Sequence, residues 1–164
     1  LALAALGASA EIMRHFDKSA VGSDNWLMQL GTLSGNPVAS AAGLKTMEVL
    51  RRDGAYDTLR ANGARLQKMQ MDTLTEVGIE HQICGDETLF DLYFTNAPCD
   101  NYRTAKHRDA RMNTVYNSTL REHGVFKSPA KLYPSLALTE DDFELTARAI
   151  SRAAQSVVEC DPTR

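Results

Sequence analysis

The sequence predicts an α/β protein of the α+β type, in which helices cover one face of a small, mostly antiparallel sheet. The first observation is the order of periodic segments after residue 54: helix, strand, strand, helix, strand, helix. The second is the alternation of apolar and other residues at 90–94, which is typical of a strand with one buried face. The third is a glycine just beyond each long helical pattern: Gly54, Gly78 and Gly124.

The composition is that of an ordinary globular protein. Of the 164 residues, 43% are hydrophobic and 24% are charged, which suits one compact domain or a small domain with part of another. The net charge of -3 argues against a nucleic-acid surface, because phosphate binding requires a basic excess on one face. Three widely spaced cysteines predict neither a disulfide framework nor a metal site, and a reducing cytoplasm is the simplest compartment.

The first ten residues are apolar but do not resemble a targeting segment. They lack an initiator methionine and a basic flank, and they are too short to cross a membrane. The run at residues 3–6, ended by Gly7, predicts a buried strand. Ser9 predicts the cap of a short helix at 10–16. We expect the chain to be a fragment of a longer protein.

Residues 17–53 combine an exposed loop with a helix of small residues. The polar segment 17–29 predicts the loop, and its Trp26 either lines a substrate entrance or anchors the loop. Asn36 and Pro37 are suited to the cap and first position of a helix that ends before Gly54. The change from small-residue to amphipathic patterning predicts two parts, residues 1–53 and 54–164.

The second part is predicted as a complete α+β unit. We expect strands at residues 79–84 and 88–94 and short strands at 125–126 and 132–138. The expected helices are 55–77, about 101–123 and a closing helix that begins at the Thr139–Asp142 capping sequence. A capping role is therefore expected for Asp141 and Asp142. The basic run Arg103, Lys106, Arg108 and Arg111 predicts a solvated helix face.

The strongest chemical signal is the segment at residues 29–37, Gln-Leu-Gly-Thr-Leu-Ser-Gly-Asn-Pro. Glycines free the backbone N–H groups to approach a ligand, and the hydroxyl groups add donors, so the loop can bind a phosphate. The same residues also make a well-capped helix start with no ligand. The residues alone leave both interpretations open. The four histidines have no ligand spacing and are expected to be surface or capping residues, so no metal is predicted: His15, His81, His107 and His123.

The string Gly-Thr-Leu-Ser-Gly-Asn-Pro, with the small-residue helix after it, resembles class III aminotransferases, which are fold-type I pyridoxal-phosphate enzymes. The similarity is greatest to the glutamate-1-semialdehyde aminomutase group, and residues 8–13, 50–56 and 135–142 also resemble family segments. The resemblance implies pyridoxal 5'-phosphate as cofactor, a small amino or keto acid as substrate, and a homodimer. It also implies that Gly31 and Thr32 reach the phosphate of the cofactor held by the partner subunit.

The resemblance further implies that this chain lacks the Schiff-base lysine, which would lie just upstream of residue 1. None of the six lysines stands in the family's sequence context: Lys18, Lys45, Lys68, Lys106, Lys127 and Lys131. Residues 1–53 would then be the end of the cofactor-binding large domain and residues 54–164 the small C-terminal domain. We expect no catalytic residue in the chain and no activity from the chain alone, although the full-length protein is expected to be an enzyme.

Two departures from the aminomutase sequence pattern leave the activity of the full-length protein open. The loop at 17–29 is longer than in the aminomutases, and Leu138 stands where many relatives have histidine. An ω- or β-amino-acid transaminase therefore remains an alternative to an aminomutase. The alternative from another class is a non-catalytic α+β interaction module that shares only the capped helix start.

Overall fold

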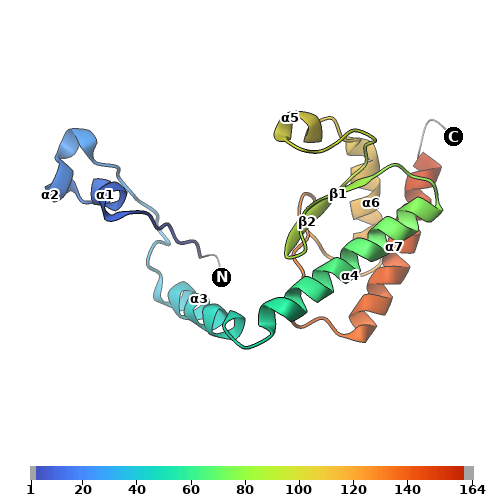
Figure 1. The fold of residues 1–164 in the computed structure, drawn as a ribbon, viewed down its shortest axis with the longest axis horizontal. Coiled ribbons are helices and arrows are strands. Elements are labelled where there is room, and N and C mark those ends of the chain that lie inside the picture. Colours follow the sequence, from blue (N-terminus) through green and yellow to red (C-terminus); the bar gives the residue numbers. More distant parts are fainter. Residues whose placement is uncertain (1–2, 161–164) are drawn as a thin grey trace. The chain divides into compact units, whose positions relative to one another are not determined.

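The computed structural model describes residues 3–160 and divides into two compact units, Leu1–Arg52 and Asp53–Arg164. Figure 1 shows the order of the elements along the chain. Unit 1 contains short helices and one long one. Unit 2 combines three long helices with a two-stranded antiparallel sheet, so the predicted α+β class is confirmed. None of the helices in residues 3–160 has both the length and the apolar character that crossing a membrane requires.

Unit 1 begins without a strand. Residues 3–9 have no regular structure, and Leu6 is 69% exposed. The prediction of a buried strand at 3–6 was wrong, because no strand lies beside this segment in the described part of unit 1. The elements that follow are α1 (Ala10–Met13), the 3₁₀ turn η1 (Arg14–Phe16), α2 (Lys18–Val21), the 3₁₀ turn η2 (Ser23–Asn25) and α3 (Pro37–Leu50).

Local capping sets the helix starts in unit 1. Ser9 Oγ accepts the backbone N–H of Ile12 at the start of α1, as the sequence predicted. The segment 17–29 is exposed apart from Val21 and Trp26, as the sequence predicted. Trp26 Nε1 donates to the Phe16 carbonyl at 3.2 Å. The Lys18 ammonium lies 5.3 Å from the centre of the indole ring. These contacts give Trp26 an anchoring role within this loop.

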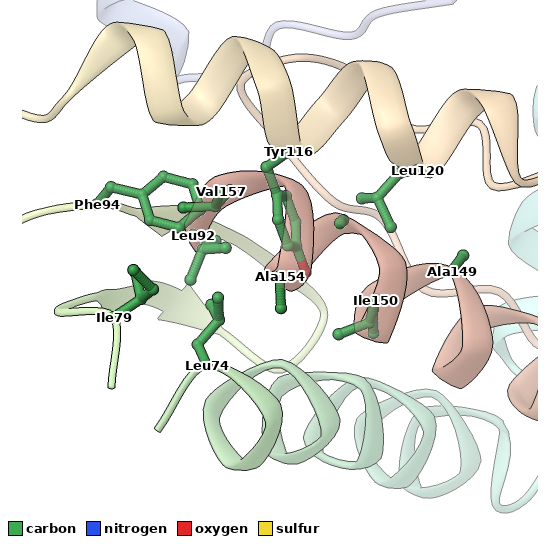
Figure 2. Close-up of a cluster of buried hydrophobic side chains, with 11 residues drawn as sticks. Leu74, Ile79, Leu92, Phe94, Tyr116, Leu120, Ala149, Ile150, Ala154 and Val157 are labelled. Atoms are coloured by element: carbon green, nitrogen blue, oxygen red, sulfur yellow. The ribbon is translucent and has the colours of Figure 1, made fainter. Parts of the chain in front are cut away.

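Unit 2 is built around a hairpin and three helices. Helix α4 (Ala55–Glu76) leads into strand β1 (Gln82–Asp86), which pairs antiparallel with β2 (Leu89–Tyr93). Helix α6 (Ala110–Glu122) packs along α7 (Glu140–Cys160), and α7 also packs on α4. The hairpin and these helices meet in one apolar core, shown in Figure 2. Its members include Leu74, Leu92, Phe94, Tyr116, Leu120, Ile150, Ala154 and Val157.

One polar contact crosses this core. The Tyr116 hydroxyl donates to Gln70 Oε1 at 3.4 Å, and both side chains are buried. Burial raises the pKa of Tyr116, so the phenol remains a neutral donor at physiological pH. The pair joins α6 to α4 while satisfying a buried amide oxygen.

The helix predicted at about 101–123 is two helices, α5 (Tyr102–Ala105) and α6, so that prediction was wrong. Asp109 is the reason for the break. Its carboxylate accepts the N–H of Met112 at 2.8 Å and caps α6, while its own N–H donates to the Phe94 carbonyl at 2.8 Å. The predicted solvated basic face is also wrong for Arg108, whose guanidinium lies 4.7 Å from the centre of the Tyr93 ring.

The predicted strands at 125–126 and 132–138 are absent from the described residues as strands. Two isolated antiparallel bridges stand in their place, one between Ser128 and Lys131 and one between Leu132 and Phe90. The latter has nitrogen-to-oxygen distances of 2.7 and 3.3 Å. Pro129 and Pro134 supply no N–H group, so this segment cannot extend the ladder. The capping prediction for Asp142 is confirmed, because its carboxylate accepts the N–H of Thr139 at 2.8 Å.

Gly63→Ala is expected to lower the free energy of unfolding by roughly 1–3 kcal/mol, as overpacking does. A methyl group at Gly63 would lie 1.7 Å from the Glu87 carbonyl oxygen. This clash outweighs the usual preference for alanine over glycine inside a helix, which is about 1 kcal/mol. Urea denaturation measures the change. Thr58→Ala, at an exposed position of the same helix, is the matched control and should be neutral or slightly stabilising. Unchanged stability of Gly63→Ala would contradict the close approach of α4 to the hairpin turn.

Candidate functional site

The loop at residues 31–36 consists of two consecutive turns. Ser34 N–H donates to the Gly31 carbonyl at 2.9 Å, and Asn36 N–H donates to the Leu33 carbonyl at 3.1 Å. Gly35 has φ 70°, a left-handed conformation that glycine adopts without strain. A Cβ atom at Gly31 would lie 2.7 Å from Ser34 Oγ. The glycines in this segment therefore have a local structural reason.

The donors at the start of α3 are already in use. Asn36 Oδ1 accepts the N–H groups of Val38 and Ala39, each at 3.0 Å, and the Asn36 carbonyl accepts the N–H of Ser40 at 2.9 Å. Pro37 has no N–H. The predicted cap is thus confirmed, and it leaves the helix N-terminus with little capacity to bind an anion. Any anion at this place has to take its donors from the loop before the helix.

Thr32 provides such donors. It is exposed, and within residues 3–160 neither its hydroxyl nor its backbone N–H has a hydrogen-bond partner. An open depression of about 660 Å³ contains Thr32 and is lined by Leu3, Ala4, Gln29, Gly31, Thr32, Leu33, Ser34 and Gly35. These lining residues include no carboxylate, so nothing in the lining repels an anion. The loop fits a phosphate group in the chemistry of its donors.

Large apolar side chains are exposed throughout unit 1. A second depression of about 790 Å³ lies along α3 and is lined mainly by small and apolar residues, Gly43 and Leu44 among them. The exposed set consists of Leu3, Leu6, Ile12, Leu27, Met28, Leu30, Leu33, Val38, Leu44 and Met47. Apolar side chains exposed in this number are typical of a part that contacts other protein.

Unit 2 contains a buried ion pair that the sequence did not reveal. The Lys127 ammonium lies 3.3 Å from Asp91 Oδ1, and the two side chains are 7% and 5% exposed. Lys127 Nζ also donates to Asn117 Oδ1 at 2.7 Å and to the Ser128 carbonyl at 2.9 Å. Asp91 Oδ2 is buried and has no hydrogen-bond partner in the described part of the chain. Asp91 and Lys127 are 36 residues apart, so no local pattern could have paired them.

Burial dominates the electrostatics of this pair. Desolvation raises the pKa of Asp91 above its ordinary value, and the Lys127 charge opposes that shift only in part. Desolvation likewise lowers the pKa of Lys127. With its three N–H groups directed at three acceptors, Lys127 is a structural cation that holds the 127–129 segment against β2 and α6. It has no donor left for a ligand.

The predicted surface position holds for His107 and His123, whereas His15 and His81 are half-buried. Nδ1 lies within 3.0 Å of a backbone carbonyl in three of them: His15, His81 and His123. Across residues 3–160 no three metal-binding side chains gather at one place. The loop of Gly31 and Thr32 is therefore the strongest candidate for a functional site.

No family model matches the chain. It is 38% identical over 156 residues to glutamate-1-semialdehyde 2,1-aminomutase 2 of Brevibacillus brevis, covering 93% of this chain and 35% of the relative. An omega-transaminase from Sphaerobacter thermophilus matches with a TM-score of 0.74 at 28% identity, over 93% of this chain and 35% of that one. A transaminase solved with PLP bound matches in fold, with a TM-score of 0.64 at 21% identity over 81% of this chain and 30% of that one.

The chain thus spans about a third of the length of the proteins it matches. These similarities confirm the predicted resemblance to glutamate-1-semialdehyde aminomutases and to transaminases. The aminomutase and the omega-transaminase each match over 93% of this chain.

Proposed function

We propose that this chain is the C-terminal part of a class III pyridoxal-phosphate aminotransferase or aminomutase that acts on a small amino or keto acid. The observation that carries the proposal is the loop at residues 31–36. Within residues 3–160 the hydroxyl and the N–H of Thr32 have no hydrogen-bond partner, while Asn36 already occupies the donors of the following helix. The identity to an aminomutase over 93% of the chain supports the same assignment.

The chain's contribution is to bind and orient. Pyridoxal phosphate, when bound, supplies the electron sink for negative charge at the substrate carbon. Thr32 Oγ1 and the N–H groups near Gly31 donate to the phosphate of the cofactor held by the partner subunit. The apolar surface of unit 1 supports contact with that subunit, since exposed side chains such as Leu30 and Leu33 would be covered there.

The lysine that carries the cofactor is proposed to lie outside these residues. Lys127 is fully engaged by three acceptors, and Lys45 and Lys68 pair on the surface with Glu48 and Asp72. A cofactor-bearing lysine needs an amine that is free to react. Residues 1–53 are then the end of a large cofactor-binding domain, and residues 54–164 are a small C-terminal domain.

The isolated chain is expected to show no transamination. Because the reactive amine is proposed to lie elsewhere, the purified 164 residues with pyridoxal phosphate and a panel of amino donors should match the rate of free cofactor. The full-length protein should bind the cofactor and transfer the amino group. Turnover by the isolated chain above the free-cofactor rate would contradict the proposal, and a full-length protein without cofactor or turnover would favour the interaction module.

An ω-amino-acid transaminase is the second candidate within this class. It is favoured by the match to the omega-transaminase from Sphaerobacter thermophilus at a TM-score of 0.74. The two activities differ in their need for an acceptor. An aminomutase converts its substrate without a second keto acid, whereas a transaminase turns over only when an external keto acid takes the amino group. Turnover of glutamate 1-semialdehyde with and without pyruvate distinguishes them.

A further inference from the structure

Two cysteines that are 15 residues apart in sequence meet beside the hairpin of unit 2. Cys84 lies in β1, and its thiol is 4.0 Å from the carbonyl oxygen of Cys99, which follows β2. The Cys99 N–H donates to Gln82 Oε1 at 3.3 Å, so a second contact to β1 holds the Cys99 segment in place. The Cys99 thiol lies 3.8 Å from the carbonyl oxygen of Ala97. Both side chains are partly exposed, which gives a small reagent access.

We propose that Cys84 and Cys99 form a reversible intramolecular disulfide when the protein meets a small disulfide oxidant such as glutathione disulfide. The bond would tie the segment after β2 to strand β1. The third cysteine, Cys160, ends α7 and takes no part. This inference is independent of the proposed enzymatic function, because it concerns a pair of thiols distant in sequence from the Gly31–Thr32 loop.

The chemistry is thiol–disulfide exchange. One protein thiol loses its proton to solvent and attacks a sulfur of glutathione disulfide, which forms a mixed disulfide and releases one glutathione. The second protein thiol loses its proton and attacks the protein sulfur of that mixed disulfide, which releases the second glutathione. Two protein S–H bonds and the oxidant's S–S bond break, one protein S–S bond forms, and two electrons pass to the oxidant.

The surroundings of Cys84 predict how the reaction depends on pH. Burial raises the pKa of the Cys84 thiol to about 11, and the neighbouring Cys99 thiol and the carboxylates of Asp91 and Asp100 add to that shift. Thiolate is the reactive species in exchange. The Cys84 thiol is therefore mostly protonated near neutral pH. Disulfide formation should become faster as the buffer becomes alkaline.

Peptide mapping of the full-length protein tests the proposal. After incubation with glutathione disulfide in mildly alkaline buffer, non-reducing digestion should yield one peptide pair joined through Cys84 and Cys99, and dithiothreitol should separate it. Cys84→Ser and Cys99→Ser should each abolish that pair, whereas Cys160→Ser, the matched control, should leave it unchanged. The joined pair should also form faster at alkaline than at neutral pH.

Three outcomes would overturn the proposal. The first is persistence of both thiols in their free form under these conditions. The second is a stable glutathione adduct on Cys84 or Cys99 without the joined pair, which would show that the second thiol cannot reach the mixed disulfide. The third is a link that requires Cys160, because that would place the reactive pair elsewhere.

Discussion

Lys127→Met is expected to lower the free energy of unfolding by roughly 3–5 kcal/mol, the cost of leaving a buried charge without its partner. Methionine keeps the apolar stem but removes the ammonium that lies 3.3 Å from Asp91 Oδ1. It also removes the donor to Asn117 Oδ1. Asp91 Oδ2 is already buried with no hydrogen-bond partner among the described residues, so the variant leaves the carboxylate without the cation that faces its other oxygen. Urea denaturation at neutral pH measures the loss.

The double variant Asp91→Leu/Lys127→Met is the matched control. Replacing a buried ion pair by apolar residues of similar volume is often neutral or stabilising. The double variant should therefore recover most of the stability that Lys127→Met loses. A double variant as unstable as the single one would show that the packing of the lysine stem, and not the stranded charge, sets the cost.

The pH dependence of Lys127→Met has a definite sign. Asp91 has a folded-state pKa raised above 3.8, chiefly by desolvation, and loss of the neighbouring cation raises it further. A carboxyl group with a raised folded pKa favours the folded state below its unfolded pKa, and this contribution is lost as the pH rises through the folded value. The stability gap between parent and Lys127→Met should therefore narrow from neutral to acidic pH. A stability difference between parent and Lys127→Met that does not change with pH would contradict the claim that the Asp91 charge causes the loss.

Thr32→Val in the full-length protein is expected to weaken the affinity for the cofactor by about 10- to 100-fold. A hydrogen bond to a charged acceptor is worth roughly 1.5–3 kcal/mol, which gives this range of affinity. Valine keeps the volume and the β-branch and removes only the donor. If Thr32 donates across the dimer interface, cofactor binding and dimer formation are coupled, so the loss should also depend on protein concentration. Cofactor titration above and below the dimer dissociation constant measures both.

Asn36→Ala separates the helix cap from the cofactor contact. Its side chain accepts two N–H groups of α3, and loss of such a cap costs about 1 kcal/mol of stability. Asn36→Ala should lower thermal stability while changing cofactor affinity less than Thr32→Val does. If Thr32→Val binds cofactor as tightly as the parent at every concentration, the loop is only a helix start and the site assignment is wrong.

Elements that depend on neighbouring residues could be predicted from the sequence. Asn36 and Pro37 fixed the start of α3, and the Thr139–Asp142 pair fixed the start of α7. Gly78, at φ 68°, marked the end of α4. In each case the groups that stop or start the helix lie within a few residues of its end, so the pattern is visible in a short window.

Contacts between distant residues could not be predicted. The break before α6 depends on the Asp109 N–H, which donates to the Phe94 carbonyl. The alternation at residues 90–94 predicts an open strand face for Asp91, but Lys127 from another segment covers it. The Gly31–Thr32 site can be proposed from the sequence because its residues are contiguous and resemble a known motif. The Cys84–Cys99 pair is separated by a strand and a turn, so it required the structure.

Reduction of the full-length protein with borohydride, followed by peptide mapping, tests the central claim most directly. Borohydride fixes pyridoxal phosphate to the lysine that carries it, so the labelled peptide identifies that residue. The proposal predicts a single label on a lysine outside these 164 residues and none on the six lysines within them. A label on any of these six lysines, or a protein that takes up no label, would contradict the assignment of this chain to the cofactor-orienting part of such an enzyme.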